Sequence, residues 1–172
     1  MTETPNGLRR RILSIIVQNE PGVLARVVDL FSGRGWNIDG LTVAAAFSAE
    51  FKDKDIARIT IVTTVDNAHL SHVVAKIDNI VPVLAVKDIT DDPDKVETDI
   101  TLVKALTDNP ELQTKISVMA QAQFRGMAIR TRATFVTLRF VGQQSAAADF
   151  VAAIRHFGVD VETAHSGPVA IA

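Results

Sequence analysis

The sequence predicts an α+β protein made of two tandem βαββαβ sandwiches. Apolar residues alternate with period two in some segments and recur every three or four residues in others, which indicates strands and amphipathic helices. The order strand, helix, strand, strand, helix, strand occurs twice, and an acidic stretch, Thr90-Asp91-Asp92-Pro93-Asp94, separates the two occurrences. Such units pack both helices on one face of an antiparallel sheet. We expect a first domain at residues 8–90, a linker at 91–97 and a second domain at 98–172.

The first unit begins with an apolar strand that leads directly into a helix. Gly33-Arg34-Gly35 should end this helix, because glycine readily takes the left-handed conformation found after a helix C-terminus. The polar residues 48–55 then separate two strands as a hairpin loop. In order, we expect a strand at 10–18, a helix at 21–33, strands at 37–47 and 56–65, a helix around 70–77 and a strand at 83–89.

The second unit repeats this order after the acidic stretch. Leu112, Ile116 and Met119 form one helical stripe, and Ala147, Phe150 and Ile154 belong to another. In order, we expect a strand at 99–106, a helix at 110–120, strands at 124–132 and 134–142, a helix around 147–154 and a strand at 159–164. Small sheets of this kind leave strand edges open, and these edges commonly pair with another copy, so we expect a homodimer.

Composition excludes several functional classes. The 172 residues are 47% apolar and 22% charged with a net charge of −2, which gives no general attraction to nucleic acid. The basic run Arg9-Arg10-Arg11 is expected to solvate the start of a strand. The absence of cysteine excludes disulfides and thiolate metal sites. No apolar run approaches the roughly 20 residues of a membrane span, and residues 2–7 do not resemble a secretory signal, so we expect a cytoplasmic protein without membrane contact.

No pattern typical of a catalytic site is found. Gly33-Arg34-Gly35 lacks the third glycine of a dinucleotide fingerprint and follows a helix instead of preceding one. His69 and His72 lie three apart on an expected helix, but no third ligand is near in sequence, so a solvated helix face is favoured over a metal site. His156 and His165 are isolated. We therefore expect no catalytic residues, no metal and no cofactor in this chain.

The remaining candidate is the junction between the first strand and the first helix. The first amides of a helix have no partner within the helix, and the helix dipole places partial positive charge there. Pro21 suits the first helical position, and Gly22 has no side chain to keep a ligand from the backbone. The junction suits a small carboxylate, although an ordinary turn capped by Asn19 or Glu20 fits the same pattern. The candidate residues here are Asn19, Glu20, Pro21, Gly22, Val23 and Leu24.

Asn37 strengthens the binding hypothesis. It follows the stop of the first helix and precedes the next strand. If two sheets pair, Asn37 of one copy can face residues 19–24 of the other, and its amide offers both a donor and an acceptor to a zwitterion. The pattern therefore favours an amino-acid sensor whose site lies between two copies.

Several segments resemble the small, regulatory subunit of acetolactate synthase (acetohydroxyacid synthase). The similarity runs from about residue 8 to 171, and its N-terminal motif is specific. The first half resembles the ACT domain of that family, a ferredoxin-like sandwich, and the second half its C-terminal domain. The matching segments are Arg10-Arg11-Ile12-Leu13-Ser14, Asn19-Glu20-Pro21-Gly22-Val23-Leu24-Ala25-Arg26-Val27, Arg34-Gly35-Trp36-Asn37-Ile38, Leu102-Val103-Lys104, Phe124-Arg125-Gly126 and Phe157-Gly158-Val159.

The resemblance implies a non-catalytic subunit that binds a separate large subunit. That partner uses thiamine diphosphate, magnesium and FAD, and the small subunit would activate it and confer feedback inhibition by valine in branched-chain amino-acid biosynthesis. In this family the effector site lies between two ACT domains. Residue by residue it would comprise Asn19, Gly22, Val23 and Leu24 of one subunit with Asn37 and Ile38 of the other. A stand-alone ACT-type amino-acid sensor that acts on a different partner is the alternative.

Overall fold

The computed structural model describes residues 7–172, and these form two compact units. The first unit takes the chain as far as Val96 together with Pro168–Ala172, and the second unit is Glu97–Gly167. The chain therefore passes between the units twice, once at residues 96–97 and once at 167–168. The structure has α+β architecture in both units, as the sequence predicts.

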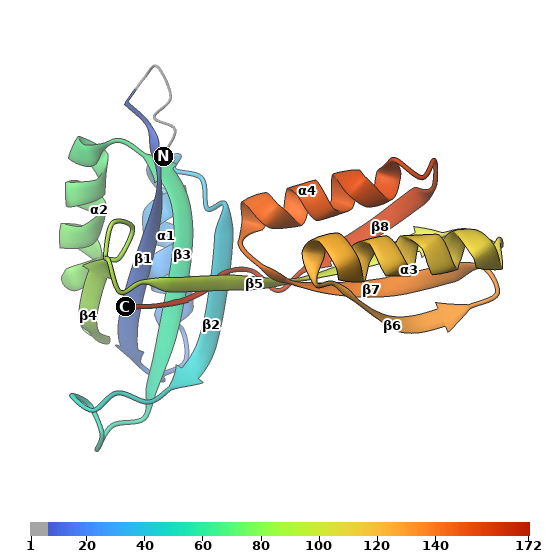
Figure 1. The fold of residues 1–172 in the computed structure, drawn as a ribbon. Coiled ribbons are helices and arrows are strands. Elements are labelled where there is room, and N and C mark those ends of the chain that lie inside the picture. Colours follow the sequence, from blue (N-terminus) through green and yellow to red (C-terminus); the bar gives the residue numbers. More distant parts are fainter. Residues whose placement is uncertain (1–6) are drawn as a thin grey trace. The chain divides into compact units, whose positions relative to one another are not determined.

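The first unit is a βαββαβ sandwich with a four-stranded antiparallel sheet in the order β2-β3-β1-β4. Both helices lie on the same face of this sheet (Figure 1). Its edge strands are therefore β2 and β4. The elements are β1 (Arg9–Gln18), α1 (Val23–Ser32), β2 (Gly40–Ala46), β3 (Ile56–Val65), α2 (Asn67–Asp78), β4 (Val83–Asp88) and the short β9 (Val169–Ile171).

The first unit buries side chains on both faces of its central strand. Leu13 and Ile15 of β1 face the helices and pack with Phe31 of α1. On the opposite face, Ile12 belongs to a second buried cluster, whose other members are Val62, Ile89 and Ala170. The chain's own last residues thus help to cover the face of the sheet that carries no helix. Burial on both faces explains why every residue from Ile12 to Val17 except Ser14 is apolar.

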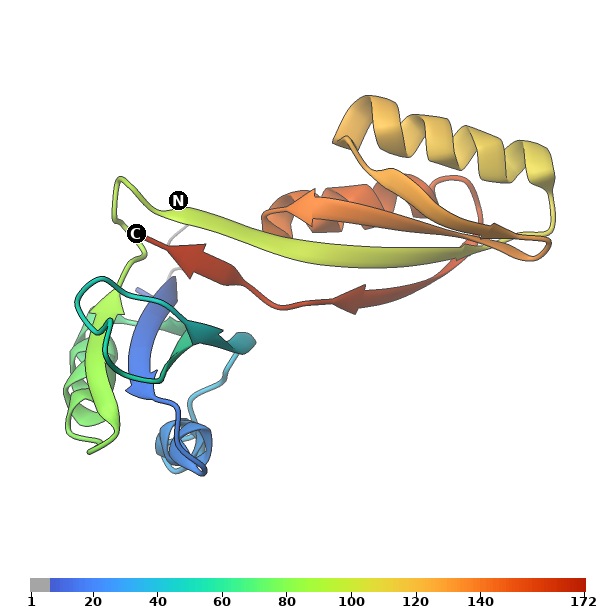
Figure 2. The same ribbon diagram turned by 90° about the horizontal axis from the view of Figure 1, so that it is seen from below.

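The second unit repeats the topology with strand order β6-β7-β5-β8 (Figures 1 and 2). Its core joins buried residues of β5 and β7 to both helices, and Phe150 stacks on Phe140 with ring centroids 5.2 Å apart. Phe124 meets the same ring edge-on at 5.4 Å. The elements are β5 (Val96–Leu106), α3 (Pro110–Phe124), β6 (Met127–Arg132), β7 (Phe135–Gly142), α4 (Gln144–Arg155) and β8 (Asp160–His165).

Several element boundaries differ from the sequence prediction, among them the starts of β5 and β6, which lie at Val96 and Met127 instead of residues 99 and 124. The helix α1 begins at Val23 instead of Pro21, because Gly22 has φ +84°, a left-handed conformation outside the helix. The strand β2 begins at Gly40 and not at residue 37. The helix α3 runs on to Phe124, which packs in the core, and it ends where Arg125 takes φ +54°. The short strand β9 is an element that the sequence did not predict.

The arginine run at the start of β1 is structural rather than simply solvated. The side chain of Arg11 is buried, and its Nη1 lies 3.6 Å from the Asp88 carboxylate and 3.7 Å from that of Asp91. Arg9 also pairs with Asp91, at 2.8 Å. The backbone N–H of Ile12 donates to the hydroxyl of Thr90 (2.9 Å). Asp88, Thr90 and Asp91 therefore fix the end of the first unit against β1.

Candidate effector site

The end of β1 is anchored to neighbouring loops before the chain turns into α1. The backbone N–H of Gln18 donates to the Pro82 carbonyl at 2.8 Å, and that of Asn19 to the Asp55 carbonyl at 3.0 Å. The side-chain amide of Asn19 lies 3.3 and 3.4 Å from the two carboxylate oxygens of Asp55. Asn19 therefore holds the turn in place from the hairpin side, and its side chain does not cap the helix.

Gly22 gives the helix N-terminus its shape. Its φ of +84° favours glycine, and a Cβ built on it would meet no atom within 4 Å. Pro21 lies in the turn and not at the first helical position, which corrects that part of the sequence interpretation. The space in front of α1 is thus open, and the backbone conformation requires a glycine there.

The first turn of α1 presents amide donors without acceptors. The N–H of Arg26 donates to the Gly22 carbonyl (3.2 Å), and that of Val23 lies 3.4 Å from the Glu20 carbonyl. Within residues 7–172, the amides of Gly22, Leu24 and Ala25 have no hydrogen-bond acceptor, the first turn holds no acidic residue, and no side chain caps the helix. The expected cap by Asn19 or Glu20 is therefore wrong, whereas the ordinary turn that the same alternative expects is present at residues 21–22. Such a terminus is complementary to an anion.

Two of the other helices, α2 and α3, have side-chain caps at their N-termini. Asp66 accepts from the N–H of His69 at the start of α2, and Asn109 accepts from two N–H groups at the start of α3. The start of α4 also lacks a side-chain cap. An uncapped terminus is thus not unique to α1. The combination of free amides with open space at Gly22 distinguishes it.

The apolar site residues are fixed by the core of the first unit. Val23 is buried, and Leu24 and Ile38 are half-buried and pack against the same core cluster. Their positions are therefore set by the fold rather than by a mobile loop. A ligand at the helix terminus would meet the exposed part of Leu24 as apolar surface.

Asn37 is exposed just before the edge strand β2. Its carbonyl accepts from the hydroxyl of Thr63 (2.6 Å), and its side-chain Nδ2 donates to Asp39 (2.6 Å). Asp39 in turn accepts from Thr64. Within one chain, no hydrogen bond joins Asn37 to residues 19–24 among the described residues. No hydrogen bond within one chain therefore joins the two halves of the predicted site.

The histidines that raised a metal hypothesis have other contacts. His69 Nδ1 lies 2.6 Å from the Asp66 carboxylate, and its ring meets Trp36 edge-on at 6.0 Å. The hydrogen bonds from the His69 backbone N–H and ring, the backbone one being the stronger influence, lower the pKa of Asp66. Across residues 7–172, no group of three or more potential ligands could hold a metal ion. His69 therefore supports the start of α2.

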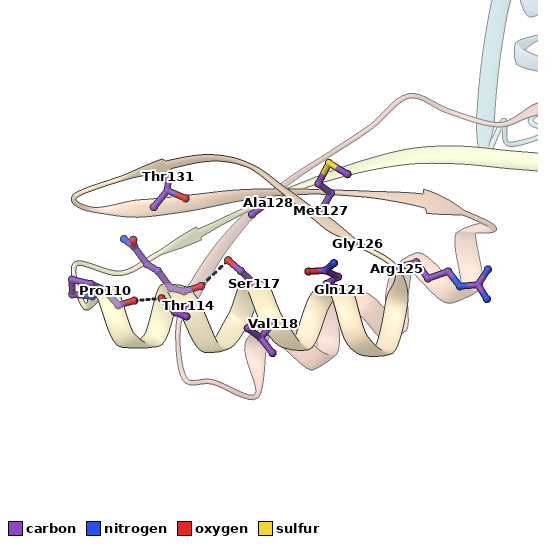
Figure 3. A pocket seen from close by; sticks show the side chains of 11 residues that line it. Pro110, Thr114, Ser117, Val118, Gln121, Arg125, Gly126, Met127, Ala128 and Thr131 are labelled. Atoms are coloured by element: carbon purple, nitrogen blue, oxygen red, sulfur yellow. Dashed lines mark hydrogen bonds between the residues drawn. The ribbon is translucent and has the colours of Figure 1, made fainter.

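A groove of about 770 Å³ lies in the second unit between α3 and β6 (Figure 3). Ser117 and Gln121 point from α3 toward β6 in this view. The groove contains no carboxylate or imidazole, so its lining offers no general acid or base of that kind. The predicted effector site lies elsewhere, at the start of α1 in the first unit. If two copies form that site, a single chain does not enclose it. The groove is lined by Pro110, Gln113, Thr114, Ser117, Val118, Gln121, Arg125, Gly126, Met127, Ala128 and Thr131.

The sequence analysis missed a polar cluster at the end of β8. The hydroxyl of Ser166 donates to the buried Asp99 carboxylate (2.7 Å), and the N–H of Ile100 donates to Ser166 Oγ (3.0 Å). His165 Nδ1 lies 3.1 Å from the Thr101 hydroxyl and 4.0 Å from Asp99. The acceptors in reach of the Ser166 hydroxyl are thus the Asp99 carboxylate and the Gly167 carbonyl (2.9 Å), and no imidazole base accepts its proton. This cluster ties β8 to β5 rather than forming a nucleophile.

Comparison with known proteins decides the family. Residues 13–85 match the family described as "AHAS small subunit-like ACT domain", and residues 98–172 match "Small subunit of acetolactate synthase". The chain belongs to the acetolactate synthase small-subunit family. It is a regulatory subunit with ACT-type domains and not the catalytic one, and a small subunit of this synthase implies a large catalytic partner.

Individual relatives cover nearly the whole chain. The small subunit of acetolactate synthase isozyme 3 from Escherichia coli is 35% identical over 167 residues, which cover 94% of each chain. The acetolactate synthase small subunit of Aquifex aeolicus is 30% identical, covering 95% of this chain and 81% of the relative. The crystal structure of the acetolactate synthase small subunit from Thermotoga maritima superposes with a TM-score of 0.80 at 27% identity, covering 95% of this chain and 96% of that one.

Proposed function

We propose that this small subunit binds valine between the ACT domains of two copies and thereby confers feedback inhibition on acetolactate synthase. The single observation that carries the proposal is the start of α1, where free amides follow a left-handed Gly22 with open space in front of it. The valine carboxylate would accept hydrogen bonds from the free amides of Gly22 and Leu24, and from the amide of Val23 in place of its long contact with the Glu20 carbonyl (3.4 Å). Asn37 and Ile38 of the second copy would contact the ammonium group and the side chain.

The proposed contacts suffice for a metabolite sensor. Charge-assisted hydrogen bonds contribute roughly 1.5–3 kcal/mol each, and burial of a branched aliphatic side chain contributes about 1.5–3 kcal/mol. Immobilising the ligand offsets much of this gain. What remains corresponds to a Kd on the order of 10–1000 μM, a range suited to reading a metabolite pool.

The two copies would meet at the edge strand β2 of the first unit. Its sequence from Gly40 to Ala46 holds no charged residue, so two such edges can pair without repulsion. Pairing there would also bring the stretch just before β2, with Asn37 and Ile38, toward the partner's helix α1. The proposed effector site is thus incomplete without the second copy.

The proposed role places the chemistry in the large subunit. Thiamine diphosphate, magnesium and FAD would be bound by that partner, while this chain would raise its activity and transmit valine inhibition. Within the described residues, no helix is both long and apolar enough to cross a bilayer. We further propose a cytoplasmic location without nucleic-acid or membrane partners. The proposed boundaries are an ACT domain at 8–90, a linker at 91–97 and a C-terminal domain at 98–172.

Calorimetric titration with valine tests the site. The wild-type chain should bind valine, and Gly22→Asp should lose binding because its carboxylate occupies the anion position and repels the ligand. Gly158→Asp is the matched control, since Gly158 also has a left-handed φ (+72°) and open space around its Cβ position but lies in the second unit. Unchanged valine affinity in Gly22→Asp would remove this site from the account.

An activity assay tests the regulatory role separately. Adding saturating small subunit should raise the turnover of the cognate large subunit, and valine should then inhibit it. In Gly22→Asp the stimulation should persist and the inhibition should be lost. A large subunit whose activity does not respond to this chain would contradict the proposed partnership.

A further inference from the structure

A carboxylate lies beside the start of α1 and belongs to a different part of the first unit. Asp55 is the last residue of the hairpin loop between β2 and β3. Its backbone carbonyl accepts from the N–H of Asn19 (3.0 Å), and its two carboxylate oxygens lie 3.3 and 3.4 Å from Asn19 Nδ2. Both the backbone and the side chain of Asn19 therefore hold Asp55 next to the turn that precedes α1.

The Asp55 carboxylate has most of its accepting capacity unused. A carboxylate can accept about four hydrogen bonds. Among residues 7–172, the only donor to this one is Asn19 Nδ2, which is shared between both oxygens at long distance. The neighbouring Lys54 does not pair with it, since its Nζ lies over the ring of Phe51, 5.7 Å from the centroid. Asp55 is exposed, so its negative charge is available to a ligand.

Two other carboxylates near the proposed effector site differ from Asp55. Asp39, on the half that a second copy would supply, is already occupied, because one oxygen accepts from Asn37 Nδ2 (2.6 Å) and the other from the Thr64 hydroxyl (2.8 Å). The side chain of Glu20 has no hydrogen bond or ion pair among the described residues, so no contact fixes its position. Of these three carboxylates, Asp55 is the one that is both held in place and able to accept further hydrogen bonds.

An anion and a zwitterion would interact differently with this arrangement. The free amides at the start of α1 favour a carboxylate, whereas the charge of Asp55 repels a ligand that is only negative. An α-amino acid carries an ammonium group next to its carboxylate, so it can satisfy the amides and Asp55 together. The 2-oxo acid of the same carbon skeleton has the carboxylate alone and would leave Asp55 unpaired. The ammonium group is therefore the feature on which discrimination can act.

We propose that Asp55 makes the effector site selective for an α-amino acid over the corresponding 2-oxo acid, by accepting a hydrogen bond from the ligand ammonium group. This inference rests on the proposed function, because it places the ligand carboxylate on the amides of α1. An ammonium group has three N–H donors. One would go to the Asp55 carboxylate, one to Oδ1 of Asn19 and one to Oδ1 of Asn37 of the second copy. Asn19 Nδ2 would remain on Asp55 and keep the acceptors together.

Selectivity of this kind matters for a subunit of acetohydroxyacid synthase. An acetohydroxy acid carries a carboxylate but no ammonium group, as does a 2-oxo acid. A site that recognised only a carboxylate and a branched side chain would therefore also accept such acids. A fixed carboxylate beside the amides excludes them without enlarging the pocket, because specificity can be achieved by an unpaired or repelled charge in the wrong complex.

Asp55→Asn tests the assignment, because it removes the charge and preserves the shape of the side chain. Calorimetric titration of the full chain compares valine with 3-methyl-2-oxobutanoate, its 2-oxo analogue. Wild type should bind valine roughly tenfold or more tightly than the oxo acid. Asp55→Asn should weaken valine binding roughly tenfold and leave the affinity for the oxo acid unchanged or higher. The ratio of the two affinities should therefore fall by about tenfold or more.

The affinity ratio separates recognition of the ammonium group from a purely structural role. If Asp55 only supported the turn through Asn19, its substitution would weaken both ligands equally and leave the ratio unchanged. Asp53→Asn is the matched control, since Asp53 is an exposed residue of the same hairpin whose side chain makes no contact among the described residues. It should leave both affinities within about twofold of wild type. Asp55→Glu retains the charge and should retain most of the selectivity.

Three results would overturn the inference. An unchanged affinity ratio in Asp55→Asn, whether or not both ligands weaken, would show that Asp55 does not recognise the ammonium group. A ratio that falls in Glu20→Gln instead would assign this role to Glu20. If Gly22→Asp leaves valine binding intact, the proposed effector site fails and Asp55 loses its role with it. Valine binding that is lost in Gly22→Asp, combined with an unchanged ratio in Asp55→Asn, would refute Asp55 alone and leave the proposed function standing.

Discussion

The helix that follows the first strand differs between the two units in how its N-terminus is completed. In the second unit, Asn109 caps α3 and Pro110 occupies a first-turn position whose N–H is not needed. In the first unit, α1 starts without a cap behind Gly22. The fold of the two units is the same, yet of these two corresponding helices only α1 begins without a side-chain cap. The proposed effector function therefore rests on local residues at one helix terminus and not on the βαββαβ topology.

The corresponding edge strands of the two units, β2 and β6, also differ. The strand β2 carries no charge, whereas β6 carries Arg130 and Arg132 and a bulge between Ala128 and Arg130. Charges and bulges on an edge oppose strand pairing. The edge strand β2 is therefore better suited to pairing with another strand than β6 is. The predictions that follow test this contrast, starting with the largest expected effect.

The two cores should respond separately to truncation. Phe31 and Phe150 are each almost fully buried, so Phe31→Ala and Phe150→Ala should each cost about 3–5 kcal/mol of unfolding free energy. The single tryptophan, Trp36, lies in the first unit and meets Phe31 edge-on. In denaturant titrations, its fluorescence should report only the loss in Phe31→Ala, while circular dichroism should report both. Equal shifts of both probes in both variants would show that the units unfold as one.

The last residues should contribute to the stability of the first unit. A Cβ on Gly40 would lie 2.9 Å from Cδ of Pro168, whose carbonyl accepts from the hydroxyl of Thr42. Gly40→Ala should therefore cost about 1–3 kcal/mol, measured by Trp36 fluorescence in denaturant. Pro168→Ala removes the clashing atom, so the double variant should recover part of this loss. A double variant that is no more stable than Gly40→Ala would contradict the proposed contact.

The capped helix of the second unit should depend on its cap. Asn109 accepts from the N–H groups of Glu111 and Leu112, so Asn109→Ala should cost about 1 kcal/mol of unfolding free energy. Gln143→Ala at the start of α4 is the matched control, because no side chain caps that helix. Circular dichroism in denaturant measures both. Equal losses in the two variants would indicate that the cap hydrogen bonds contribute nothing specific.

The smallest expected effect is on the pH dependence of stability. It concerns α2, which is capped by the carboxylate of Asp66, and not α3, which is capped by the amide of Asn109. The pKa of Asp66 is lowered from its ordinary value of 3.8, mainly by the hydrogen bond from the His69 N–H. A carboxyl with a lowered folded-state pKa contributes stability that is complete above pH 3.8 and is lost as the pH falls through the lowered value. Asp66→Asn should make the stability of the first unit less dependent on pH below about 4. An unchanged acid-side slope in Trp36-monitored unfolding would contradict this cap.

The fold could be predicted from the sequence because its signals are local. The stripe of α1, with Val27 and Phe31, and the alternation in β3 depend on neighbours within one element. The boundaries depended on more than this. A proline such as Pro21 commonly begins a helix, but the left-handed Gly22 delays the start of α1 to Val23. The tail strand β9 could not be predicted, since it is held by contacts with residues such as Ile12 that are more than 150 positions away.

The candidate site could be located only in part from the sequence. Gly22, between a strand and a helix, indicated residues 19–24 as the candidate site. The hydrogen bond from Asn19 to Asp55 could not be predicted, because Asp55 lies in a hairpin loop more than 30 residues away. The buried role of Arg11 was missed for a similar reason, because its carboxylate partners follow a distant strand.

The most direct test of the account is a crystal structure of the small subunit grown with saturating valine. The account predicts valine between two copies, with its carboxylate on the amides of Gly22, Val23 and Leu24 of one chain and Asn37 of the other chain in contact with it. Valine bound elsewhere, such as in the groove between α3 and β6, with the start of α1 unoccupied, would contradict the central claim.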